Sequence, residues 1–490
     1  MKRRIGRVEF QQSFIVPPQL ALFIGVVFVI LAFRSDRKRG IPAPEELFWP
    51  TLWYMVVSSR AIGIWFNIWE IPISAGGSDP TEGSQIDRWF FVALTFFGLR
   101  ILIRRKFQWS AAFQSNPWLT ALIVFMAVSI LWSQYPYVSF KRYIKVIGSV
   151  VMAMVVLTNE RPFEAFLTVL RRGLYVHLPM SVVCVKYFRD IGVSYNYWGG
   201  GESWQGIATS KNTLAQVAML GTIYFLREVR LRWAEVGWRN IHVLYLMMAI
   251  YLLKGSPVTI SMTSVAVCVF AGIVFFRIRS LRDRPESIAP FVRAVFGCTA
   301  ALIALVLVHS VVFFSEDSFF GYLITKFGRD ITLTDRVHIW SDVYSAASKS
   351  PVFGIGFGGF WIGRLANIPW NASMTWVLGQ AHSGYVDTYL QLGWVGGVLL
   401  AGVIFSTLPR LLAAFNENFD FACFRVTLFL TILFVNITES TYLRGDHHLW
   451  MIFMLVAWNV PEPVRVESEA ATAPIDAKFA EPAQETAVPV

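Results

Sequence analysis

Charged residues are scarce in this chain of 490 residues: they make up 15%, whereas soluble domains carry about 25%. Hydrophobic residues make up 55%, and they gather in runs of the length that crosses a bilayer. A soluble fold cannot bury so many long apolar runs, so the composition excludes a soluble domain. It predicts an all-α polytopic membrane protein, because helices satisfy their own backbone hydrogen bonds in lipid.

Several other features are rare or missing. The four cysteines each lie in an apolar run, so we expect buried thiols without disulfides: Cys184, Cys268, Cys298 and Cys423. No Cys/His cluster has metal-ligand spacing, and no Walker or dinucleotide loop is present, so we expect neither metal nor cofactor. No A-x-A cleavage site follows the first apolar run, 17–33, which we interpret as a retained helix.

What the chain does have is thirteen apolar runs of spanning length or nearly so, which predict about 12–14 transmembrane helices. The runs are 17–33, 47–68, 89–103, 117–133, 143–158, 164–187, 212–226, 240–253, 258–276, 290–314, 383–408, 422–438 and 448–460. Four parts follow: helices over 1–314, a large loop over 315–381, C-terminal helices over 382–460, and a tail over 461–490. The tail lacks a helical period, so we expect it to be disordered.

The excess of Lys and Arg, a net charge of +11, is interpreted as a topology signal and not as nucleic-acid binding. Four basic clusters fall on alternate loops, so one topology places all of them in the cytoplasm. The same topology places segment 188–211 and the 315–381 loop outside. It also places the basic N-terminus outside, against the rule. The clusters are Arg34–Arg39, Arg100–Lys106, Arg227–Arg239 and Arg277–Arg284.

The large loop carries a polar island with two arginines, Arg329 and Arg336. A helix from about Asp335 to Ser348 is predicted, with Trp340 and Tyr344 on an apolar stripe that suits the membrane interface. An arginine offers a fixed fork of donors that matches phosphate oxygens, so Arg336, with Arg329, is a candidate phosphate clamp. The alternative is a solvated charge or an ion pair with a neighbouring aspartate.

Two more candidates lie at predicted helix starts. His382 follows the loop where the next long apolar run begins, and imidazole is suited to take a proton near neutral pH. The alternative is an interfacial histidine satisfied by water. Lys211 follows Ser210, and it is either a second phosphate ligand at a helix N-terminus or part of a plain helix cap.

Arg171 and Arg172 lie inside the sixth apolar run. Charge within the membrane is costly, at about 2.5–3.5 kcal/mol on insertion scales, and therefore suggests a function. Both arginines also lie close enough to the cytoplasmic end to extend their guanidinium groups into water. The sequence leaves these two interpretations open.

Several loose motifs follow one another along the chain in a specific order and spacing: Trp132-Ser-Gln-Tyr-Pro136, Phe140-Lys-Arg142 with Lys145, Leu178-Pro-Met-Ser181, Ser210-Lys-Asn212, Gly328-Arg-Asp330, Thr332-Leu-Thr-Asp-Arg336, Ser350-Pro-Val-Phe-Gly-Ile-Gly-Phe357 and Ala381-His-Ser-Gly-Tyr385. Together, they resemble the O-antigen ligase/Wzy polymerase superfamily, closest to exopolysaccharide polymerases of the ExoQ type. The resemblance covers most of the chain except the tail.

The resemblance implies a metal-independent glycosyltransferase of the bacterial inner membrane. It would polymerise oligosaccharide repeat units carried by undecaprenyl diphosphate into exopolysaccharide or O-antigen at the periplasmic face. In such enzymes arginines hold the diphosphate and a histidine activates the acceptor hydroxyl; Arg336 and His382 match them. A chain-length regulator and a flippase are candidate partners. The alternatives are a ligase that transfers glycan to lipid A-core or protein and, from another class, a flippase or transporter of lipid-linked sugar, which only the Arg171/Arg172 pair favours.

The chain departs from the family pattern at one position. The family carries a basic residue in a Ser-Arg-Thr or Ser-Lys-Thr turn, and Met262 stands at the matching position here. Either Lys211, Lys254 or Arg329 substitutes for it, or the diphosphate clamp is weaker.

Overall fold

A computed structural model describes residues 16–38, 44–69, 71, 84–195, 201–256, 260–312, 336–362 and 379–460. Arg329, much of the 315–381 loop and the 461–490 tail lie outside the described residues. The predictions on them stay predictions.

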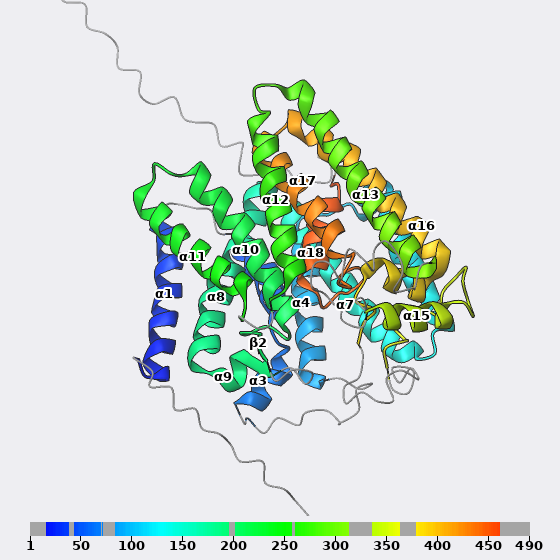
Figure 1. Cartoon of the computed structure of the whole chain (residues 1–490), viewed down its shortest axis with the longest axis horizontal. Helices are drawn as coiled ribbons and strands as arrows, with labels where there is room; N and C mark the ends of the chain where they lie inside the picture. The colour runs from blue at the N-terminus through cyan, green and yellow to red at the C-terminus, as the bar shows by residue number, and fades with distance from the viewer. Residues whose placement is uncertain are drawn as a thin grey trace, which may run out of the picture.

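The predicted all-α membrane fold class is confirmed: the described residues are mostly helical (Figure 1). Each of the thirteen apolar runs overlaps a helix, but the run 47–68 is divided into two helices by a break at Ser59–Ala61. The longer helices are α1 (Pro18–Lys38), α2 (Phe48–Ser58), α4 (Gln85–Arg104), α6 (Pro117–Ser129), α7 (Pro136–Leu157), α8 (Pro162–Tyr187), α10 (Lys211–Leu231), α11 (Val236–Lys254), α12 (Met262–Ser280), α13 (Ile288–Val312), α15 (Arg336–Ala347), α16 (Gly384–Ala413), α17 (Phe419–Val435) and α18 (His448–Ala457).

Short elements join these helices. They are α3 (Ile62–Ile68), α5 (Trp109–Gln114), α9 (Arg189–Gly192) and four 3₁₀ turns: η1 (Glu45–Leu47), η2 (Ile130–Trp132), η3 (Pro285–Ser287) and η6 (Ala414–Asn416). Strands β1 (Val193–Tyr195) and β2 (Glu202–Trp204) form an antiparallel pair, with Ser194 opposite Ser203.

Four helical segments are long and apolar enough to cross a membrane by themselves, counted over the described part of the chain. They are Pro18–Lys38, Met262–Ser280, Pro285–Val308 and Gly384–Asn416. The other helices are shorter or carry more polar and charged residues, so the predicted total of about 12–14 spans stays a prediction. Exposed apolar side chains on these helices suit contact with lipid: Phe23, Ile24, Val269, Ile273, Val398 and Phe405.

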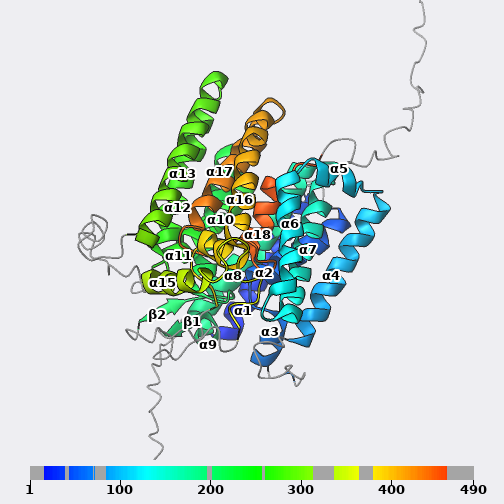
Figure 2. The same cartoon turned by 90° about the vertical axis from the view of Figure 1, so that its right-hand side faces the viewer.

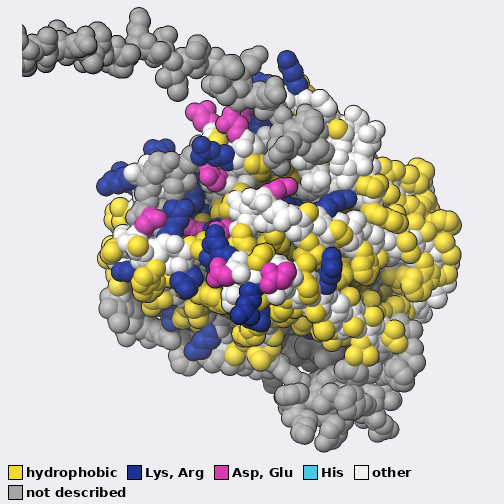
Figure 3. Space-filling view, turned by 90° about the horizontal axis from the view of Figure 1, so that it is seen from above, with side chains coloured by type: hydrophobic (Ala, Val, Ile, Leu, Met, Phe, Trp, Pro, Cys, Tyr) yellow, Lys and Arg dark blue, Asp and Glu magenta, His cyan; other side chains and the backbone are white. Residues whose placement is uncertain are grey.

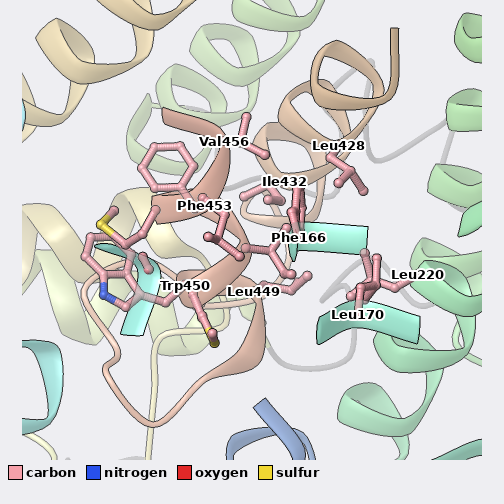
Figure 4. Packing of buried hydrophobic residues seen from close by; sticks show 14 of the residues in the cluster. Phe166, Leu170, Leu220, Leu428, Ile432, Leu449, Trp450, Phe453 and Val456 are labelled. Carbon is pink, nitrogen blue, oxygen red and sulfur yellow. The ribbon is translucent and has the colours of Figure 1, made fainter. Parts of the chain in front are cut away.

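The centre of the molecule is α18, which is apolar on all sides and buried along its whole length. It packs against α2, α7, α16 and α17. Figure 4 shows Leu449 and Phe453 of α18 among side chains of α8, α10 and α17. Ten residues rise only about 15 Å, so α18 acts as a core helix and its termini lie inside the protein.

The two ends of the bundle differ in charge. The last turns of α1, α4, α10 and α12 carry basic residues, and these helix ends lie at the top of Figure 1. Figure 3 looks onto this end and shows many Lys and Arg side chains. The helices α9 and α15 and the strand β2 lie at the opposite end (Figures 1 and 2). The basic clusters are therefore on one side, as the topology prediction requires, and α15 is on the other.

The expectation that every cysteine is buried is wrong for Cys298, which is exposed on α13. Cys423 is buried, Cys184 and Cys268 are half-buried, and all four thiols are free. An apolar run alone does not show which of its faces meets lipid and which meets protein, since lipid tails are as apolar as leucine.

Arg171 lies in a buried contact between α8 and α1. Its Nε donates to Asp36 Oδ2 at 2.8 Å, and the Tyr175 hydroxyl donates to Asp36 Oδ1 at 3.2 Å. Both members of the ion pair are nearly inaccessible to solvent. A buried charge needs such a partner, so this contact favours a structural role for Arg171 in holding α1 against α8.

The apolar stripe of α15 packs against protein, so the prediction that it lies at the membrane interface is wrong for Trp340. Trp340 is 3% exposed, and its Nε1 donates to the carbonyl oxygen of Ala381 at 2.8 Å. Val343 and Ala347 belong to the same buried cluster, together with Val386 and Leu390 of α16. The contact holds α15 against the segment that contains His382.

A kink in α16 holds the turn over residues 350–357 in position. At the kink Gly393 has φ +61°, and the next two amides, those of Trp394 and Val395, donate to the carbonyl oxygens of Pro351 and Val352 in the turn. A Cβ on Gly393 would lie 2.4 Å from the Val352 oxygen, so only glycine allows this approach.

Candidate functional site

The site is centred on the carboxylate of Glu439. The Arg336 Nη2 donates to its Oε1 at 3.1 Å, and the Asn212 Nδ2 donates to the same oxygen at 2.8 Å. The other oxygen, Oε2, lies 3.7 Å from the Nδ1 of His382. The Glu439 side chain is 9% exposed, so this carboxylate depends on its partners for compensation. The structure thus brings Arg336 and His382, which are 46 positions apart, to one carboxylate.

Three elements present the donors to Glu439. Arg336 is the first residue of α15, and Asn212 is the second residue of α10. Glu439 lies in the connection between α17 and α18, where the Asn436 side-chain oxygen accepts from the amides of Thr441 and Tyr442. These bonds shape a tight turn that fixes the direction of the Glu439 side chain.

His382 has an unusual backbone. Its φ is +52°, in the left-handed region that most side chains avoid. The next amide, that of Ser383, donates to the Ser440 Oγ at 3.1 Å, and the amide of Gly384 donates to the Asn436 and Glu439 carbonyl oxygens. These contacts tie His382 to the Glu439 turn, and α16 begins only at Gly384, two residues after the predicted start. Such strain concentrates at functional sites.

Gln380 is the second neighbour of the imidazole. Its Nε2 lies 3.2 Å from His382 Nδ1, while its Oε1 accepts from the Arg444 Nη1 at 2.8 Å. Arginine can only donate, so the bond from Arg444 sets which way the Gln380 amide points. The Gln380 nitrogen therefore faces His382.

Beside Gln380 lies a cavity of about 110 Å³, far more than the roughly 10–15 Å³ that one water needs. Its lining mixes cations, carboxylates, amides and aromatic rings, which include Arg142, Lys145, Trp361, Asp387, Tyr442, Arg444 and Asp446. Asp387 accepts from Trp361 Nε1 at 2.8 Å and from the Ala381 amide at 3.1 Å, which braces the wall next to His382. Such a lining suits a ligand rich in hydroxyl groups.

Two other residues singled out from the sequence, Lys211 and Met262, lie at helix starts. Lys211 is the first residue of α10, and the predicted Ser210 cap is confirmed because its side chain accepts from the Thr213 amide at 3.2 Å. The contact with Glu439 comes from the neighbouring Asn212. Met262 begins α12 and is half exposed. Within the described ranges no group of three His, Cys, Asp or Glu residues could hold a metal ion.

Sequence reasoning missed Glu439 and Arg444. Glu439 does carry a signal: it is the only acidic residue between Asp420 and Asp446, and it directly follows an apolar run. An isolated carboxylate at the edge of a membrane helix is a functional candidate by default. Arg444 has no comparable signal, because a basic residue in a short loop also fits a purely topological role.

The comparisons with known proteins agree with the sequence motifs. Residues 242–401 match the family model described as O-antigen ligase. The resemblance to the O-antigen ligase family is confirmed. The chain is also 25% identical over 330 residues to the exopolysaccharide production protein ExoQ of Rhizobium meliloti, a match that covers 65% of this chain and 72% of that protein. The span matched by the O-antigen ligase model includes Arg336 and His382, and Glu439 lies beyond it.

Proposed function

We propose that this chain is an inner-membrane glycosyltransferase that polymerises oligosaccharide repeat units carried on undecaprenyl diphosphate, at the periplasmic face. The observation that carries the proposal is the convergence of Arg336 and His382 on Glu439. A glycosyl transfer from a diphosphate needs a cation at the leaving group and a base at the acceptor. The O-antigen ligase family match and the similarity to ExoQ support the same chemistry.

In the proposed reaction an acceptor hydroxyl oxygen attacks the anomeric carbon of the donor sugar. The bond from that carbon to the diphosphate oxygen breaks, and undecaprenyl diphosphate leaves with the electron pair. Arg336, with Arg329 and Lys211 as candidate helpers, stabilises the growing negative charge. His382 takes the proton of the hydroxyl. The leaving group is already activated, so the proposed mechanism needs no cofactor.

Two cavities suit the two substrates. The polar cavity beside Gln380 has the lining that an acceptor saccharide needs. An apolar cavity of about 360 Å³, to which α8 contributes more residues than any other helix, suits part of a polyprenyl tail. It includes Ile207, five residues before Asn212. Membrane and loop together hold donor and acceptor, which lowers the entropic cost of bringing them together.

The alternative of a ligase to lipid A-core or protein uses the same site with another acceptor. The alternative of a flippase rested on Arg171 and Arg172. Arg171 is neutralised by Asp36 between two helices, which removes the main support for that alternative.

Reconstitution tests the proposal. Purified protein in vesicles, supplied with lipid-linked repeat units extracted from the host, is expected to produce a ladder of lengthening glycans on a gel. Transfer to lipid A-core or protein without a ladder indicates a ligase. Movement of the lipid-linked sugar across the vesicle membrane without any glycan product would overturn the enzymatic function.

The periplasmic position of the α15 loop has its own test. After Cys298→Ser removes the exposed native thiol, Ser348→Cys is expected to react with a membrane-impermeant maleimide in spheroplasts, because Ser348 is exposed at the end of α15. The matched control, Ser280→Cys, lies at the basic end of α12 and is expected to react only after lysis. The reverse pattern would invert the proposed topology.

A further inference from the structure

The two oxygens of Glu439 are used unequally. Oε1 accepts from both Arg336 and Asn212, at 3.1 and 2.8 Å, whereas Oε2 stays 3.7 Å from the Nδ1 of His382. That separation is beyond hydrogen-bonding distance. At the same time, Nδ1 lies 3.2 Å from the nitrogen of Gln380. Nδ1 of His382 is therefore within hydrogen-bonding distance of a donor, the Gln380 nitrogen, and lies just beyond that distance from an acceptor, Glu439 Oε2.

This arrangement fixes the tautomer of a neutral His382. The Gln380 nitrogen can only donate, and the bond from Arg444 to Gln380 Oε1 prevents the amide from turning round. Nδ1 must then accept, so the ring hydrogen is on Nε2. In this state the lone pair of Nδ1 is occupied and Nε2 has none to offer. The imidazole is not ready to take a proton from an acceptor hydroxyl.

The active tautomer needs Glu439. When Nδ1 carries the hydrogen, it requires an acceptor, and Glu439 Oε2 is the carboxylate oxygen next to it. Nε2 then has a free lone pair. A carboxylate held only by Asn212 attracts Nδ1–H more strongly than one that also binds an arginine, and it stabilises the imidazolium that forms after proton transfer.

We propose that Glu439 couples donor binding to activation of His382, through an exchange of Arg336 from Glu439 to the donor diphosphate. This inference rests on the proposed function. A diphosphate offers more charge and more oxygens than one carboxylate, so it competes well for the fork of donors on Arg336. Once Arg336 moves, the imidazole turns from Gln380 toward Glu439. Oε2 then accepts Nδ1–H, and the proton on Nε2 passes to water as Nδ1 gains one. The base is thus switched on only when a donor is bound.

The groups around His382 support such a switch. Arg336 and Glu439 face it from α15 and the α17–α18 connection, and Arg444 acts on it through Gln380. Asp387 is occupied by Trp361 and the Ala381 amide. Among the described neighbours, Glu439 is therefore the carboxylate in position to orient the ring. In this scheme it is a positioning residue, because it acts through His382 and Arg336.

The decisive variant is Glu439→Gln, which keeps the size and the hydrogen-bonding groups but removes the charge. Without the carboxylate, Arg336 is released, so undecaprenyl diphosphate is expected to bind about tenfold more tightly in detergent. Turnover with extracted lipid-linked repeat units is expected to fall about 100-fold, because Nδ1–H loses its charged acceptor. Tighter binding with slower turnover is a signature that a purely structural role would not produce.

Two further variants complete the set. Glu439→Asp keeps the charge and is expected to recover part of the turnover. Glu417→Gln is the matched control, because Glu417 is an exposed acid near the other end of α17 and is expected to change neither quantity. If wild-type protein neither binds undecaprenyl diphosphate nor makes polymer, the proposed function fails. If it does both, and Glu439→Gln keeps wild-type turnover or binds no more tightly, only the coupling is overturned.

A measurement on the wild-type protein does not depend on the folding of any variant. The chain has 7 histidines, so the ¹⁵N signals of labelled imidazoles are few, and comparison with His382→Gln assigns that of His382. We expect Nε2–H in the free protein and Nδ1–H after addition of undecaprenyl diphosphate. The same tautomer in both states would refute the switch.

Discussion

His382→Gln is expected to lower the initial rate of polymer formation by about 10²–10⁴, the usual contribution of a general base. Glutamine can still form hydrogen bonds with Glu439 and water, but it cannot accept a proton from an acceptor hydroxyl. His382 is partly exposed and lies outside the apolar core, so loss of the imidazole contacts themselves should cost little stability. The rate is measured as ladder growth from extracted lipid-linked repeat units, at equal amounts of purified protein.

The backbone at this position calls for a second variant. At φ +52° a glutamine is strained, whereas asparagine tolerates the left-handed region well. His382→Asn therefore separates the cost of the backbone from the loss of the base. Equal loss of activity in both variants, with the thermal stability of His382→Asn close to wild type, supports the chemical role. Near wild-type ladder growth in either variant would mean that His382 is not the base and has only a structural role before the start of α16.

Local patterns predicted the membrane helices and the charge asymmetry of the two ends. The apolar runs depend on residues that follow one another in the chain, so their helices could be located without knowledge of the fold. The Ser210 cap is equally local, since its bond reaches only to Thr213. The gathering of the basic clusters at one end followed from basic residues at the ends of those same runs, and which side of the membrane that end faces stays a prediction.

The composition of the site could be predicted only in part. Arg336 and His382 were found through motifs, but their common partner Glu439 lies 103 positions from Arg336 and 227 from Asn212. Such contacts depend on how α10, α15 and the α17–α18 connection pack, which no local pattern contains. The same limit explains the errors at Trp340 and Cys298. An apolar stripe is suited equally to lipid and to protein, and only the packing decides between them.

Arg336→Ala is expected to lower the rate of polymer formation by about 10²–10³, because a preorganised charge at the leaving diphosphate is lost. Arg336→Lys should also lose most of the activity, since a point charge cannot reproduce a two-pronged contact with phosphate oxygens. The loss should appear as weaker binding of undecaprenyl diphosphate as well as slower ladder growth. This pattern differs from that expected for Glu439→Gln, where binding tightens.

Removing Arg336 also leaves Glu439 largely buried without its cation, so Arg336→Ala alone can lose activity through a fold cost of about 1–3 kcal/mol. The double variant Arg336→Ala/Glu439→Gln removes both charges and serves as the control. Its thermal unfolding in detergent is expected to return toward wild type, while its activity stays at the level of the single variant or below. Activity equal to that of Glu439→Gln alone, together with recovered stability, would mean that Arg336 only neutralises Glu439. A stable double variant whose activity falls well below that of Glu439→Gln alone leaves the diphosphate as the group that Arg336 serves, because the carboxylate that it neutralises is absent from both of those variants.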